Sequence, residues 1–140
     1  MEKEIHEQPR VISLAFEYYF DQKTGKVTLP DNLSLNFNDF EQISLVACGT
    51  AFYACHVAKY WFEEIARIPV EIDIASEFRY REPPIKGNTL AIFVSQSGET
   101  ADTLAALRYC SGKAKKILSI TNVAESSISR ESDHSLPILA

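Results

Sequence analysis

A hydroxyl-rich segment at residues 95–100 contains the side chains of this sequence that are best suited to bind a ligand. It reads Ser-Gln-Ser-Gly-Glu-Thr and separates an apolar run at 90–94 from a segment, 101–107, whose apolar residues recur at helical spacing. This pattern predicts a turn between a buried strand and a helix. The first N–H groups of a helix lack internal partners and carry the positive end of its dipole, so the turn is suited to bind an anion.

Three hydroxyls and a glycine make this turn a predicted phosphate site. Ser95, Ser97 and Thr100 can each donate a hydrogen bond, and Gly98 lets the backbone approach a ligand closely. A structural interpretation stays open, in which Ser97 is an ordinary helix N-cap and Thr100 belongs to the first helical turn. Such short motifs also occur by chance, so their spacing does not decide between the two.

Alternating strands and helices are predicted for the chain after residue 42. The expected strands are short apolar runs at 43–48, 70–75, 90–94, 116–121 and 136–139. The expected helices lie at 51–67, from the hydroxyl-rich turn to about 111, and at 126–131, with a polar connector at 76–88. Glu71 and Asp73 alternate with apolar residues, which favours an edge position for the second strand. The predicted fold class is therefore α/β: an open, doubly wound, five-stranded parallel sheet flanked by helices, as in flavodoxin.

The first 40 residues are predicted to form an N-terminal helix and linker, with the sheet domain at 41–140. Apolar residues in 2–20 indicate an amphipathic helix that is interrupted or begins near Pro9, and residues 21–38 are rich in turn formers. The side chains expected to face the core from the helix at 51–67 are Ala54, Ala58, Trp61, Phe62 and Ile65.

A second small polar turn is predicted to meet the first one in space. Gly49 and Thr50 follow the first strand, as residues 95–100 follow the third. In a sheet of strand order 2-1-3-4-5 the order reverses between these two strands, and ligands bind outside their carboxyl ends. Hydroxyls and the Gln96 amide favour a polyhydroxylated phosphate ester, whereas the G-x-G-x-x-G and P-loop motifs of nucleotide sites do not occur.

Composition and charge argue against several other functions. A net charge of −5 and a pI near 5.2 argue against nucleic acid or a membrane surface as partner. No apolar run is long enough to span a bilayer and the first residues lack the apolar core of a signal peptide, so a cytoplasmic location is expected. The three cysteines are expected to be free thiols, and the three isolated histidines suggest no metal site, so no metal or cofactor is predicted.

Several motifs follow one another along the chain. They are Lys-Glu-Ile and Glu-Gln-Pro near the start, Val-Ala-Cys-Gly-Thr at 46–50, Ala-Arg-Ile-Pro-Val-Glu at 66–71, Ala-Ser-Glu-Phe-Arg-Tyr-Arg at 75–81 and Ser-Gln-Ser-Gly-Glu-Thr-Ala-Asp-Thr at 95–103. Their combination resembles the first sugar isomerase (SIS) domain of the glucosamine-6-phosphate synthase family, the isomerising glutamine:fructose-6-phosphate aminotransferases. The resemblance covers nearly the whole chain.

The resemblance implies a sugar-phosphate site without a catalytic residue in this chain. The predicted substrate-binding residues are Gly49, Thr50, Ser95, Gln96, Ser97, Gly98 and Thr100. In the family, the hydroxyls of the 95–100 segment hold the phosphate, while Thr50 and Gln96 match residues that contact the sugar. The family usually has Ser at the position of Ala51, so this chain has one hydroxyl fewer there. The family's general base and ring-opening lysine lie in the second SIS domain.

The implied ligand is a phosphorylated sugar: fructose 6-phosphate, glucosamine 6-phosphate or glucose 6-phosphate. The family's reaction also needs a glutaminase domain and a second SIS domain, so the chain alone is expected to be inactive and to form a homodimer or associate with a second SIS domain. Glu99 is the local alternative for a base, but a carboxylate in the first turn of a helix is held charged by the dipole. A stand-alone sugar-phosphate sensor and a structural domain that binds nothing stay open as alternatives.

Overall fold

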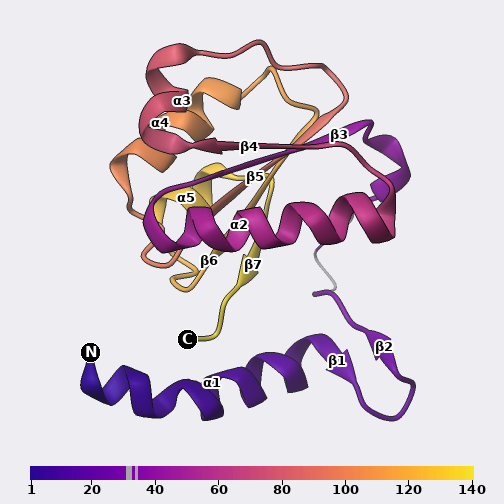
Figure 1. The fold of residues 1–140 in the computed structure, drawn as a ribbon, viewed down its shortest axis with the longest axis vertical. Coiled ribbons are helices and arrows are strands. Elements are labelled where there is room, and N and C mark those ends of the chain that lie inside the picture. Colours follow the sequence, from indigo (N-terminus) through magenta and orange to yellow (C-terminus); the bar gives the residue numbers. More distant parts are fainter. Residues whose placement is uncertain (31–32, 34) are drawn as a thin grey trace.

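The computed structural model describes residues 1–30, 33 and 35–140 of the chain. Its centre is a parallel sheet of five strands in the order β4-β3-β5-β6-β7 (Figure 1). The strands are β3 (Gln42–Ala47), β4 (Val70–Ile74), β5 (Thr89–Ser95), β6 (Lys116–Thr121) and β7 (His134–Pro137). This is the order 2-1-3-4-5, for which the reversal lies between the first and third strands; β4 is at an edge as predicted, and the predicted fold class is confirmed.

Helices between the strands cover both faces of the sheet. They are α2 (Gly49–Trp61), which continues into the π-helical turn η2 (Phe62–Ala66), α3 (Ala75–Arg81), α4 (Ala101–Cys110) and α5 (Ser127–Glu131). One face packs against α2 around Ile43, Leu90 and Cys55, and the other packs against α3, α4 and α5 around Phe78 and Phe93. Burial of each large apolar side chain contributes about 2 kcal/mol, so these two layers hold the strand ends in place.

The prediction of a polar connector at 76–88 is wrong for residues 76–81, because these residues belong to the helix α3. The buried side chains of α3 are Ala75 and Phe78, and the residues between and after them are polar or exposed. Two buried positions in seven residues produce too weak a periodic signal to indicate a helix. Contact of Phe78 with the core, which is a tertiary interaction, stabilises this helix.

The predicted buried face of α2 is also partly wrong. Cys55 is buried and Phe52 and Phe62 pack beside it, whereas Trp61 is 62% and Ile65 is 79% exposed. Apolar residues surround most of this helix, so their spacing cannot show which side meets the sheet. The consequence is an exposed apolar face on α2 and η2.

The N-terminal segment lies outside the sheet domain in Figure 1. It comprises α1 (Glu2–Tyr19) and the hairpin of β1 (Phe20–Asp21) and β2 (Lys26–Val27). The short 3-10 helix η1 (Phe37–Asp39) lies beside the sheet, just before β3 (Figure 1). α1 runs through Pro9 without interruption, and none of its residues is buried. The Tyr19 hydroxyl donates a hydrogen bond of 2.6 Å to the Pro137 carbonyl, and burial, with a smaller effect of Tyr18, raises the pKa of Tyr19 to about 12. In the described residues no helix is both long and apolar enough to cross a bilayer.

Candidate functional site

An open hollow of about 330 Å³ lies at the carboxyl ends of β3 and β5, where the strand order reverses. The residues that line it come from the ends of these strands and the turns that follow: Cys48, Gly49, Thr50, Ala51, Val94, Ser95, Gln96, Ser97 and Thr100. The structure thus brings together every residue predicted for the substrate site except Gly98. Val94 was not predicted, although its register pairing with Ala47 places it between the two turns.

Two helices begin at this hollow, and neither is capped by a side chain. α2 starts at Gly49 after Cys48, and α4 starts at Ala101 after Thr100, yet neither Cys48 nor Thr100 accepts a helix N–H with its side chain. With 13 and 10 residues, both helices present the positive ends of their dipoles to the same space. This geometry favours an anion such as phosphate. The alternative in which Ser97 is the N-cap is wrong, because Thr100 occupies that position.

The three hydroxyls of the turn have different surroundings. Ser95 is 3% exposed, and its Oγ accepts the Gly98 N–H at 3.1 Å and lies 2.9 Å from Thr100 Oγ1. Ser97 is exposed, and its Oγ accepts the Glu99 N–H at 3.2 Å. Ser97 and Thr100 therefore have access to a ligand, whereas Ser95 stabilises the turn from inside.

Gly98 packs against α5 instead of lining the hollow. Its φ is +68°, and a Cβ at this position would clash with the Cβ and Oγ of Ser126. Its carbonyl accepts the Ile128 N–H at 3.0 Å. The glycine is needed because the turn lies directly on the N-terminal end of α5.

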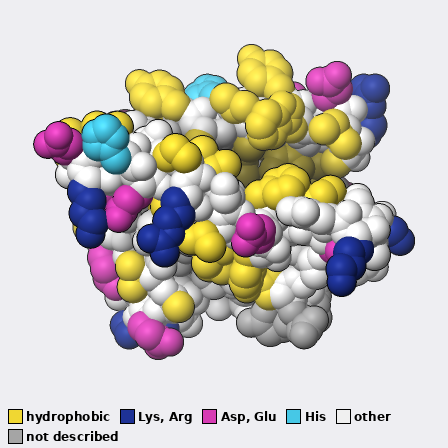
Figure 2. All heavy atoms as spheres, turned by 90° about the horizontal axis from the view of Figure 1, so that it is seen from below, with side chains coloured by type: hydrophobic (Ala, Val, Ile, Leu, Met, Phe, Trp, Pro, Cys, Tyr) yellow, Lys and Arg dark blue, Asp and Glu magenta, His cyan; other side chains and the backbone are white. Residues whose placement is uncertain are grey.

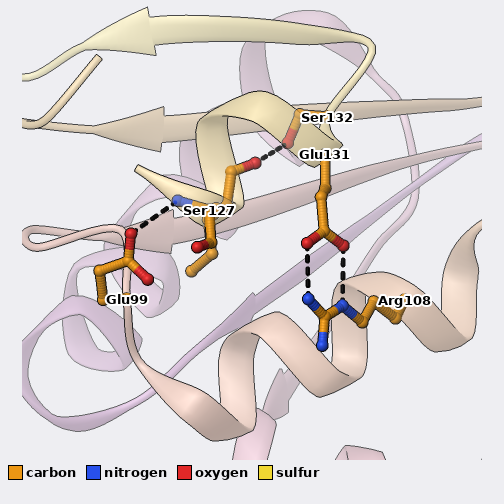
Figure 3. Close-up of polar contacts among 6 residues, drawn as sticks. Glu99, Arg108, Ser127, Glu131 and Ser132 are labelled. Atoms are coloured by element: carbon orange, nitrogen blue, oxygen red, sulfur yellow. Dashed lines mark hydrogen bonds and ion pairs between the residues drawn. The ribbon is translucent and has the colours of Figure 1, made fainter. Parts of the chain in front are cut away.

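Glu99 points toward α5 (Figure 3). Its Oε1 accepts the Ser127 N–H at 2.7 Å, and this bond is the main cause that lowers the pKa of Glu99 below its usual value. α5 is joined to α4 by two hydrogen bonds of 2.7 and 2.6 Å between Arg108 and Glu131. The charged form of Glu99 is thus stabilised as predicted, but at the N-terminus of α5 and not of α4. A carboxylate in this state is a poor proton acceptor.

A second, larger hollow of about 560 Å³ lies beside the edge strand β4. Buried polar residues such as Gln42 and Thr89 and charged residues of both signs, including Glu71 and Arg81, line it. It is at the opposite, amino-terminal end of β3 and β5, away from both small polar turns. Within residues 1–30, 33 and 35–140, no group of three or more His, Cys, Asp or Glu side chains is placed to hold a metal ion.

The family profile of the SIS domain matches residues 37–140. The chain belongs to the SIS domain family. Over 140 residues it is 56% identical to proteins of Bradyrhizobium diazoefficiens and Brucella abortus that are named glutamine–fructose-6-phosphate aminotransferase (isomerizing). These matches cover 100% of this chain and 23% of each relative, so the chain spans less than a quarter of their length.

Solved structures agree with this assignment of the SIS domain. The C-terminal domain of glucosamine-fructose-6-phosphate aminotransferase from Francisella tularensis matches with a TM-score of 0.87 and 39% identity, over 97% of this chain and 38% of that one. Glucosamine-6-phosphate deaminase from Thermotoga maritima matches with a TM-score of 0.64 and 26% identity, over 79% of this chain and 35% of that one. The resemblance to the isomerising aminotransferases that the motifs indicate is therefore confirmed.

Proposed function

We propose that this SIS domain is the sugar-phosphate-binding half of the isomerase part of an isomerising glutamine:fructose-6-phosphate aminotransferase. The observation that carries the proposal is the meeting of two uncapped helix N-termini with the hydroxyls of Ser97 and Thr100 at one hollow. The ligand is fructose 6-phosphate or glucosamine 6-phosphate, because the similar aminotransferases are named for the first of these sugars. Residues 1–40 would act as helix and linker to the SIS domain at 41–140.

In the proposed complex the chain binds and orients the sugar and leaves proton transfer to other residues. Ser97, Thr100 and the first N–H groups of α4 bind the phosphate, and Thr50 and Gln96 lie beside it to contact the sugar. Movement of a proton between adjacent sugar carbons needs a base whose pKa lies near the working pH. Among the residues that the structure describes, no His, Asp, Glu or Lys lines the hollow, and Glu99 is engaged by α5. The base would therefore come from a second SIS domain.

Thermal unfolding with sugar phosphates tests this proposal. A ligand that binds only the native state at about 100 times its Kd stabilises it by about 2.7 kcal/mol, so fructose 6-phosphate and glucosamine 6-phosphate are expected to raise the Tm with concentration. Ser97→Ala and Thr100→Ala are each expected to weaken binding about tenfold, because each removes a hydrogen bond to a charged group. The exposed Ser111, which follows α4, provides the matched control Ser111→Ala, with unchanged binding.

Free fructose serves as the ligand control, since it lacks the phosphate. No rise in Tm with either sugar phosphate at millimolar concentration, in a chain that unfolds cooperatively, would show that the proposed site is wrong. An equal rise with free fructose would show that the phosphate is not what the turn binds.

We further propose that the exposed apolar face of α2 and η2 joins a second SIS unit, which for this chain alone is a second copy in a homodimer. Hydrophobic side chains gather along α1 and α2 in Figure 2. Those of α2 and η2 that are half or more exposed are Tyr53, Val57, Tyr60, Trp61 and Ile65. Exposed patches of this kind mark association surfaces. A cytoplasmic location is proposed as well.

Sedimentation velocity tests this association. The chain is expected to sediment as a dimer at high concentration, and a Trp61→Glu, Ile65→Glu double variant as a monomer, because two like charges would then be buried without partners. Tyr80 is 77% exposed on α3, so Tyr80→Glu is the control and should leave the dimer intact. A strict monomer for the unmodified chain at high concentration would contradict the proposal.

A further inference from the structure

The turn at 95–100 has an inner and an outer side. Gln96, Ser97 and Thr100 line the hollow from the inner side. Gly98 and Glu99 do not line it, and both contact the segment that begins α5. The side of the turn that would meet a ligand is therefore separate from the side that is held by the protein.

The N-terminal N–H groups of α5 are capped mainly by this turn. The Ser127 N–H donates to the Glu99 carboxylate at 2.7 Å and the Ile128 N–H to the Gly98 carbonyl at 3.0 Å. The next donor, the Ser129 N–H, bonds the Ser126 hydroxyl at 3.4 Å. Because a helix leaves its first N–H groups without internal partners, the turn and α5 complete each other's hydrogen bonds.

α5 is itself fixed to the rest of the domain. Ile128 is fully buried in the core that α3 and α4 share, and Ser126 is 2% exposed. The paired hydrogen bonds between Arg108 and Glu131 tie the far end of α5 to α4 (Figure 3). A contact of the turn with α5 is thus a contact with a helix that Ile128 anchors in the core.

We infer that Glu99 is a positioning residue for the anion site: it holds the turn on α5 and keeps its own negative charge at the N-terminus of that helix. This inference rests on the function proposed above. The direction of the side chain is shown in Figure 3, where the carboxylate faces Ser127. If the carboxylate left this place, the turn would lose a bond on its outer side and a negative charge would be free beside a phosphate site.

The charge and the hydrogen bond have separable effects. Glu99→Gln keeps an oxygen that can accept the Ser127 N–H and removes the charge, so it is expected to bind fructose 6-phosphate within about twofold of the unmodified chain. Glu99→Ala removes the acceptor and leaves the Ser127 N–H without its partner, so the Ile128–Gly98 bond alone joins the turn to the first N–H groups of α5. Its affinity is expected to fall about fivefold or more, and by the same factor for inorganic phosphate, because the turn binds the phosphate group.

A matched variant in the same helix separates positioning from general stability. Glu131→Ala breaks the ion pair with Arg108 and loosens α5 at its far end, but Glu131 has no hydrogen bond to the turn. It is expected to keep the affinity for fructose 6-phosphate within about twofold, since an exposed ion pair contributes little to the stability of the fold. Hydrogen exchange of the Ser127 amide is the second readout, slow in the unmodified chain and in Glu99→Gln and fast in Glu99→Ala.

The outcomes distinguish this inference from the proposed function. If Ser97→Ala and Thr100→Ala weaken binding but Glu99→Ala does not, the function stands and the inference is overturned. An equal loss in Glu99→Ala and Glu131→Ala, or no rescue by Glu99→Gln, also overturns it. If the unmodified chain binds no sugar phosphate, the proposed function fails and the role of Glu99 fails with it.

Discussion

Replacement of Gly98 with alanine is expected to lower the free energy of unfolding by about 3 kcal/mol and to abolish sugar-phosphate binding at micromolar ligand. Two causes add at this position. The left-handed backbone with φ of +68° strains any residue with a Cβ, by about 1 kcal/mol. The new methyl group would also occupy the space of the Ser126 side chain, and overpacking of this kind costs about 2 kcal/mol. The turn would have to move away from α5, which changes the inner side as well.

Gly112 provides the control for this prediction. It has a similar φ of +74°, but a Cβ there would meet no atom within 4 Å. Gly112→Ala is therefore expected to show only the strain, about 1 kcal/mol, with unchanged ligand binding. Urea denaturation measures the free energy of unfolding of both variants. The double variant Gly98→Ala, Ser126→Gly should regain the roughly 2 kcal/mol that overpacking costs, because the Ser126 side chain is then absent. Equal losses in the two alanine variants would contradict the role of the contact with Ser126.

The strands, most of the helices and, for the strand order 2-1-3-4-5, the place of the hollow could be predicted because they depend on local patterns. Apolar runs separated by amphipathic segments indicate strands and helices, and the right-handed crossover rule leaves few ways to connect them. Small polar residues at 49–50 and 95–100 then fall at the ends of adjacent strands. The register of β3 with β5, which pairs Ala47 with Val94, brings the two turns to one edge of the sheet.

The features that could not be predicted depend on contacts between distant parts of the chain. Nothing in the local sequence shows that Glu99 caps a helix 28 residues further on. The same holds for Gly98, whose predicted role was close approach to a ligand and whose observed close neighbour is Ser126. The exposed side of α2 was misplaced because Trp61 and Ile65 are as apolar as core residues. Hydrophobic spacing finds a helix, but it does not say which apolar side is covered by the same chain.

Ser95→Ala is expected to reduce both stability and binding, whereas Ser97→Ala should reduce binding alone. The Ser95 Oγ accepts the buried Gly98 N–H and contacts the Thr100 hydroxyl, so its removal leaves a donor without a partner. A loss of about 2 kcal/mol in the free energy of unfolding is expected for Ser95→Ala. Ser97 is exposed, and the Glu99 N–H that it accepts can bond to water instead, so its loss should change stability by less than about 0.5 kcal/mol.

Urea denaturation and titration calorimetry with fructose 6-phosphate, applied to both variants, decide how Ser95 acts. The resemblance to the family assigns the phosphate to Ser95 as well as to Ser97 and Thr100, but a side chain that is 3% exposed and bonded internally can help only through its neighbours. The Thr100 hydroxyl would lose the contact that orients it, so binding by Ser95→Ala should weaken about fivefold. Weaker binding by Ser95→Ala with unchanged stability would instead mean that Ser95 turns outward and contacts the phosphate itself.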